Sequence, residues 1–88
     1  MEGIRIGEIS HYYNQISVAV INLSDTLQVG ESVHILGRTT DFRQKVISMQ
    51  IEHEAIEQAG PGQEIALKVV RRVRRGDKVF KLLTGEVE

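Results

Sequence analysis

The sequence predicts an all-β fold, because of its apolar composition, the period of its hydrophobic runs and its turn residues. The chain holds ten Val and ten Ile against six Leu and four Ala. β-Branched side chains lose rotamer freedom in a helix and pack well on a pleated sheet. Short runs of alternating apolar and polar residues are separated by segments rich in turn-forming residues. Six such runs predict a closed barrel or a small sandwich.

The six predicted strands follow one another along the chain. They are RIGEISHYY (5–13), ISVAVINL (16–23), ESVHILG (31–37), KVISMQIEH (45–53), EIALKVV (64–70) and KVFKLL (78–83). In the first run, alternation places Ile6 and Ile9 on opposite faces. In the later runs it groups the side chains Val33 and Ile35, then Ile47, Met49 and Ile51 opposite Val46, then Ile65, Leu67 and Val69. The segment HEAIEQA (53–59) is predicted to form a helical turn.

Three glycines precede strands in a shared pattern, within GESVHI, GQEIAL and GDKVFK. Glycine adopts positive φ at no steric cost, so a sharp turn before a strand favours it. We therefore expect Gly30, Gly62 and Gly76 to have left-handed backbone conformations. Their spacing is unequal, which indicates recurring turn chemistry and not a solenoid.

Length and charge limit the class of protein. Eighty-eight residues predict one domain covering residues 1–88. With 11 Lys and Arg against 12 Asp and Glu, the chain as a whole is not a polycation. No cysteine is present, which excludes disulfides and thiol chemistry, and no signal-like start or long apolar run appears. We expect a cytoplasmic protein with no membrane partner.

Candidate catalytic groups are few. The three histidines are separated by 23 and 19 residues, which matches no zinc signature. Ser10 and His11 are adjacent on a strand and point to opposite faces, so they do not form part of a triad. No G-x-x-x-x-G-K-[ST] segment is present, which argues against a nucleotide triphosphate site. We predict no catalytic residue, no metal, no cofactor and no enzymatic activity.

Two long segments resemble a known family. LQVGESVHILG (27–37) resembles the L-x-x-G-D/E-x-V-x-I-x-G segment in domain 2 of translational GTPases of the elongation factor Tu type. Residues 46–80 are similar to the same domain in the order of an H-E-A-I corner, an A-x-P-G turn and R-R-G-D-x-V. This resemblance implies a six-stranded Greek-key β-barrel, here as a stand-alone translation elongation factor-like protein. It also places Gln50 and His53 at the pocket for the tRNA 3′ end.

A basic segment, KVVRRVRRGDKVFK (68–81), carries seven basic side chains and one acid. If Val69 and Val73 face inward, Lys68, Arg72 and Arg74 project outward, whereas Arg71 faces inward near the barrel end. Arginine presents a planar donor fork that matches phosphate oxygens. We predict phosphate contacts to RNA through six side chains: Lys68, Arg72, Arg74, Arg38, Arg43 and Lys45. The alternative is a solvated face of a strand pair, with the cations paired to Glu52, Glu54, Glu57 and Glu64.

Two functions from different classes remain at this stage. The leading prediction is a binding module without GTPase activity that contacts tRNA or ribosomal RNA and pairs with a separate GTPase. The alternative is an accessory protein-interaction barrel that docks on a separately encoded enzyme, as similar small barrels do at the ends of U32 peptidase-like chains. That alternative predicts an interface centred on an exposed apolar patch and little response to salt.

Overall fold

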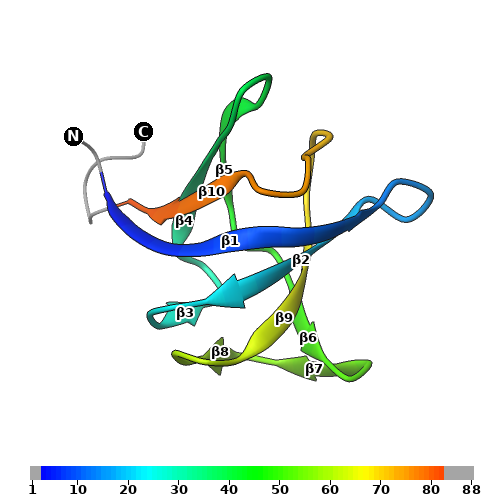
Figure 1. The fold of residues 1–88 in the computed structure, drawn as a ribbon. Coiled ribbons are helices and arrows are strands. Elements are labelled where there is room, and N and C mark those ends of the chain that lie inside the picture. The colour runs from blue at the N-terminus through cyan, green and yellow to red at the C-terminus, as the bar shows by residue number, and fades with distance from the viewer. Residues whose placement is uncertain (1–2, 83–88) are drawn as a thin grey trace.

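The computed structural model describes residues 3–82 and shows an all-β fold (Figure 1). Ten strands follow one another along the chain: β1 (Ile4–Tyr13), β2 (Val18–Leu23), β3 (Leu27–Gln28), β4 (Ser32–Leu36), β5 (Asp41–Lys45), β6 (Met49–Ile51), β7 (Glu54–Ile56), β8 (Gln58–Ala59), β9 (Glu64–Lys68) and β10 (Lys78–Lys81). The all-β prediction is therefore confirmed. Leu83, the last residue of the sixth predicted strand, lies outside the described residues.

Eight of these strands form one antiparallel sheet that curls into a half-barrel, in the order β5-β4-β10-β1-β2-β9-β6-β7 (Figure 1). The short strands β3 and β8 pair separately. Of the ten strands, β3, β5, β7 and β8 have no counterpart among the six predicted runs. Residues 3–82 include no helix long and apolar enough to cross a membrane.

The core lies inside the curl of the sheet. Val33, Ile35, Ile65, Leu67, Val69 and Val73 are at most 2% exposed, as alternation predicts. The prediction is wrong for Val46 and Ile47, because alternation grouped Ile47 with Met49 on the face opposite Val46. Val46 and Met49 are both buried, and Ile47 is 60% exposed. Residues 46–48 lie between β5 and β6 and belong to neither strand, so alternation does not carry through them.

Strand β1 departs from alternation because it contains two irregularities in register. Pairing shifts between Arg5 and Gly7 on the β10 side, and between Ile9 and His11 on the β2 side. A bulge adds one residue to one strand and rotates the side chains that follow. Ile6 and Ile9 are consequently both buried, and not on opposite faces as predicted.

The three glycines that precede strands have φ values of 99° at Gly30, 86° at Gly62 and 93° at Gly76, which confirms their predicted backbone conformation. The predicted helical turn over residues 53–59 is wrong. Strands β6 and β7 form a hairpin, and β8 follows in the same segment. One helical turn is unstable alone, and strand pairing satisfies the same backbone groups across the sheet.

Candidate interaction surfaces

The basic segment lies mainly in the connection from β9 to β10, residues 69–77, which we call the arginine connection. We expected a pair of adjacent strands here, and that expectation is wrong. Strand β9 pairs with β2 and β6, whereas β10 pairs with β1 and β4. The connection therefore crosses one end of the sheet, over β2 and β1 (Figure 1).

Gln44 of β5 fixes the start of the arginine connection. Its Nε2 donates to the carbonyl of Lys68 at 2.9 Å, and its Oε1 accepts the amide N–H of Val70 at 2.8 Å. The Gln44 side chain thus bonds the backbone at the end of β9 as a neighbouring strand would, although β5 and β9 do not pair. The amide of Val69 donates to the carbonyl of Ser17 at 2.9 Å. The connection is thereby tied to β5 and to the β1–β2 hairpin.

Asp77 fixes the other end of the connection. This residue is 4% exposed, and its Oδ2 accepts the amide N–H of Arg74 at 2.8 Å. The amide of Gly76 donates to the Ile9 carbonyl at the β1 bulge, at 2.8 Å. A side chain at Gly37 would clash with the Asp77 carboxylate, so the base of the β4–β5 hairpin touches the same turn. The R-R-G-D segment is therefore a structural turn fixed by the buried Asp77, and its arginines are exposed.

All four arginines of the connection, Arg71, Arg72, Arg74 and Arg75, are exposed. The inward orientation expected for Arg71 is wrong, because the connection is not a strand: Val69 and Val73 turn inward, whereas Val70 and Arg71 are both exposed. Among residues 3–82, none of the four forms an ion pair with a carboxylate. The segments that carry Glu52, Glu54, Glu57 and Glu64 lie around β7, β8 and the start of β9, at the opposite end of the sheet (Figure 1).

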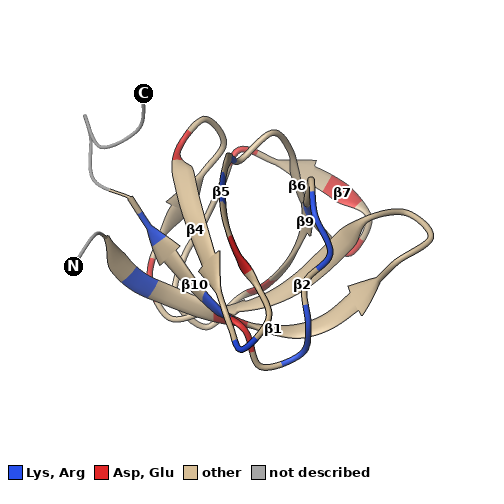
Figure 2. Cartoon of the chain, turned by 90° about the horizontal axis from the view of Figure 1, so that it is seen from above, with Lys and Arg blue, Asp and Glu red and all other residues tan. Residues whose placement is uncertain are grey.

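The other predicted phosphate ligands divide by position. Lys68 is exposed, but its Nζ donates to the carbonyl of Ile16 at 2.9 Å and so stabilises the β1–β2 hairpin. Arg38 lies in the β4–β5 turn at the same end as the arginine connection, and Arg43 and Lys45 lie exposed on β5. Seen from this end, Lys and Arg residues, drawn in blue, lie on the connection after β9 and on the β4–β5 turn (Figure 2). What these side chains bind stays a prediction.

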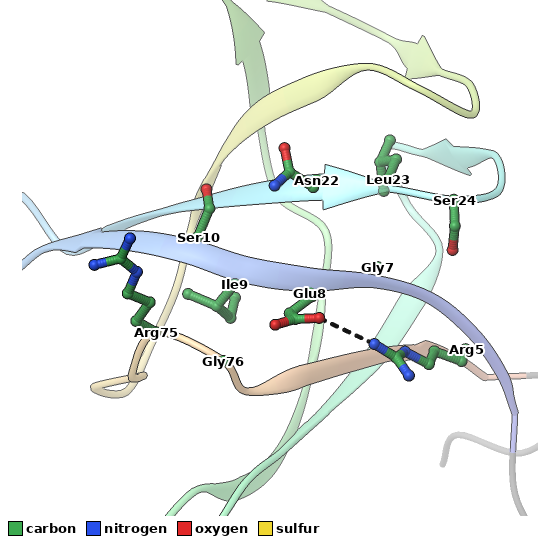
Figure 3. A pocket seen from close by; sticks show the side chains of 10 residues that line it. All are labelled: Arg5, Gly7, Glu8, Ile9, Ser10, Asn22, Leu23, Ser24, Arg75 and Gly76. Atoms are coloured by element: carbon green, nitrogen blue, oxygen red, sulfur yellow. Dashed lines mark hydrogen bonds and ion pairs between the residues drawn. The ribbon is translucent and has the colours of Figure 1, made fainter.

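A groove of about 700 Å³, not foreseen from the sequence, lies over β1, β2 and the arginine connection. Arg75 and Arg5 stand at its two ends with Glu8 between them, and Arg5 Nη2 donates to Glu8 Oε1 at 3.1 Å (Figure 3). Seventy positions separate the two arginines in sequence. The hydrogen bond from Gly76 to Ile9 at the β1 bulge places Arg75 on the same groove as Arg5, and no periodicity of the sequence signals that arrangement.

A second groove, of about 540 Å³, brings Gln50 and His53 together. Cross-strand pairs place Val20 beside Ala66, and Ala66 beside Gln50, along its floor. Glu52 and His53 form the tight turn between β6 and β7, with φ values of 51° and 70°. The predicted pair thus shares one groove, on a hairpin where a helical turn was expected.

Metal-binding groups do not converge. No cluster of three or more His, Asp or Glu side chains suited to a metal ion occurs within residues 3–82. His34 Nε2 lies 2.6 Å from Asp41 Oδ1 on the neighbouring strand. Ser10 Oγ lies within hydrogen-bond distance of the Val20 carbonyl and of Glu64 Oε2, and not of a histidine.

No family model matches the chain, but individual proteins do. An uncharacterized protease of Methanocaldococcus jannaschii is 39% identical over 80 residues, which are 90% of this chain and 20% of that protein. A collagenase of Porphyromonas gingivalis is 32% identical over 80 residues, 89% of this chain and 19% of that protein. The chain thus spans about a fifth of the length of the curated relatives it matches.

Two crystal structures of the C-terminal domain of a putative U32 peptidase from Geobacillus thermoleovorans share the fold. Both give a TM-score of 0.83 at 20% identity. For the selenomethionine variant the match covers 88% of this chain and 98% of that domain, and for the other structure 90% and 91%. The chain therefore shares its fold with the C-terminal domain of that putative peptidase.

The predicted relationship to elongation factor Tu domain 2 is wrong, and with it the role in translation. The proteins that this chain resembles are named as proteases, collagenases and a U32 peptidase domain. The misleading segments, at Gly30, Gly62 and Gly76, are tight turns that enter strands. Glycine is favoured wherever the backbone takes positive φ before a strand, so these segments indicate turn geometry more than a function.

Proposed function

We propose that this chain is an accessory domain of a U32-type peptidase, which docks on the catalytic part of such an enzyme and has no active site of its own. The observation that carries the proposal is the match of nearly the whole chain to a discrete peptidase domain, at a TM-score of 0.83. The identity of 39% to about a fifth of a protease supports the same assignment. Interfaces of this kind between domains are commonly modest in area and partly polar.

Ser10 and His11 do not form the serine–histidine pair of a serine hydrolase. In such a pair the histidine lies within hydrogen-bond reach of the serine hydroxyl. Ser10 Oγ faces a carbonyl and the Glu64 carboxylate, and His11 instead packs its ring against Tyr13 with centroids 4.3 Å apart. The finer prediction of a closed six-stranded barrel stays a prediction, and the proposal depends only on the curled sheet.

Binding in trans tests the proposal. The M. jannaschii protease is produced without the 80-residue segment that this chain matches, and the purified chain is added to it in a calorimeter. We expect a complex with a dissociation constant in the micromolar range, on the order of −8 kcal/mol. The excised segment of the protease itself is the positive control, and bovine serum albumin replaces the truncated enzyme as the negative control.

If the excised segment binds the truncated enzyme and this chain does not, the accessory role is wrong. Peptidase activity of the chain alone on a fluorescent casein substrate, retained through repeated purification, would contradict the absence of an active site.

A further inference from the structure

Three large aliphatic side chains stand out from the surface of the described residues. Ile47 is 60% exposed, Val70 59% and Ile16 57%, which are the highest values among the large hydrophobic residues of that part of the chain. Single exposed aliphatic side chains are common in folded proteins. A group of them at one place more often marks an interaction site.

Hydrogen bonds bring Ile16 close to the segment that carries Val70, and the course of the chain from β5 to β6 brings Ile47 to the same segment. Lys68 Nζ holds the carbonyl of Ile16, and the amide of Val69 holds the carbonyl of Ser17. Val70 follows directly and, two residues beyond Lys68, projects on the same outward side, since Val69 between them is buried. Ile47 lies between Gln44, which bonds Lys68 and Val70, and Met49, which pairs with Leu67, so the backbone that carries it passes beside residues 67–70.

Cations surround this aliphatic group. Lys68 precedes Val70 by two positions, and Arg71 and Arg72 follow it immediately. Among residues 3–82, neither arginine forms an ion pair, and the segments around β7 and β8 that carry the glutamates lie at the other end of the sheet (Figure 1). We call Ile16, Ile47, Val70, Lys68, Arg71 and Arg72 the docking face.

We infer that the docking face binds an apolar surface with an acidic rim on the catalytic part of the peptidase. The inference rests on the accessory role proposed above and names its surface. A partner with carboxylates around one or two apolar side chains complements both the charge and the aliphatic centre. Protein interfaces combine an apolar centre with arginine in this way, and charge around the rim steers association.

A nucleic acid fits the same face less well. Its phosphates would use Arg71 and Arg72, but most contacts to nucleic acid go to phosphate and sugar and leave aliphatic side chains without a role. Three aliphatic side chains more than half exposed therefore favour a protein partner.

A matched pair of variants tests the inference in the trans-binding assay. The first variant combines Val70→Ser with Arg72→Ala on the docking face. The control combines Ile4→Ser with Arg5→Ala, away from the docking face. It likewise removes one exposed aliphatic side chain and one exposed arginine, since Ile4 is 48% exposed and Arg5 is exposed. Thermal unfolding of both variants establishes that each is folded. We expect the first variant to bind the truncated enzyme at least ~10-fold more weakly, and the control to bind within ~2-fold of the wild type.

Salt dependence and competition separate the outcomes. The wild-type dissociation constant should rise between 50 and 300 mM salt, roughly severalfold, and Arg71→Glu with Arg72→Glu should abolish that rise. Equal binding by both matched variants, with the wild type bound, overturns the docking face and leaves the accessory role intact. Absence of wild-type binding overturns both. Displacement of the enzyme by a short duplex oligonucleotide, together with loss of oligonucleotide binding in the first variant, overturns the protein partner in favour of nucleic acid.

Discussion

Glu52 and His53 have left-handed backbone conformations, which cost conformational free energy in residues other than glycine. Both have positive φ in a two-residue turn that joins β6 to β7, the geometry of a type I′ hairpin. Asn-Gly is the preferred pair in such a turn, since each ordinary residue in this conformation costs roughly 1–2 kcal/mol. The two side chains line the second groove with Gln50.

We expect the double substitution Glu52→Asn, His53→Gly to stabilise the protein. Relief of two left-handed residues should raise the free energy of unfolding by about 1–2 kcal/mol. Urea unfolding followed by circular dichroism measures the change. The control is Glu54→Gly on β7, where glycine should lower the free energy of unfolding by roughly 0.5–1 kcal/mol. Destabilisation by the double substitution would show that the two side chains stabilise the hairpin by contacts that outweigh their strain.

Single residues also show where alternation predicts burial well. Ile65 and Leu67 follow it because β9 pairs with β2 over its whole length without irregularity, and Val69 directly after the strand continues the pattern. Ile9 and Ile47 do not follow it, the first because of a bulge and the second because its segment leaves the ladder. Gly7 inside the first run is a sequence marker of the bulge, whereas the break at Ile47 has none nearby.

At the scale of elements, Gln44 is the main link between β5 and the arginine connection. Its amide group both donates to Lys68 and accepts from Val70, and Lys68 in turn holds the β1–β2 hairpin. The docking face therefore depends on a side chain that lies outside it.

We expect Gln44→Ala to loosen the start of the arginine connection. Loss of two hydrogen bonds should lower the free energy of unfolding by about 1–2 kcal/mol, and the amide of Val70 should exchange its hydrogen faster. Hydrogen exchange read by NMR measures the second effect at that residue. Gln58→Ala is the matched control, since its amide bonds only another exposed side chain, that of Gln28. An unchanged exchange rate at Val70 would show that the bond does not hold the connection in solution.

The whole molecule combines a nearly neutral net charge with an arginine-rich β9–β10 connection and a glutamate-rich segment around β7 and β8 at opposite ends of the sheet. The net charge of −1 gives no sign of this separation. It arises because the β9–β10 connection and the β6–β7 hairpin emerge at opposite ends of antiparallel strands (Figure 1). Strand β10 is central to this arrangement, since it pairs with β1 on one side and β4 on the other.

We expect Val79→Asp to disrupt the entire sheet. Val79 is fully buried at the middle of β10 and is opposite Ile35 of β4 and Gly7 of β1. An unpaired carboxylate buried there should cost at least ~4 kcal/mol, which is much of the stability of a small domain. Circular dichroism and thermal unfolding measure the loss. Leu36→Asp, at a position 39% exposed, should unfold close to the wild-type temperature. Cooperative unfolding of Val79→Asp near the wild-type temperature would mean that β10 is not central to stability.

The amino-acid sequence alone was sufficient for the all-β class, for the left-handed glycines and for the inward side chains of β4 and β9. These features depend on local rotamer entropy, φ preference and a period of two, all of which act over a few residues. The partners of each strand, the bulges of β1, the β6–β7 hairpin and the gathering of Ile16, Ile47 and Val70 depended on the three-dimensional arrangement. They result from packing and hydrogen bonds between segments far apart in the chain, and local sequence patterns carry little information about such contacts.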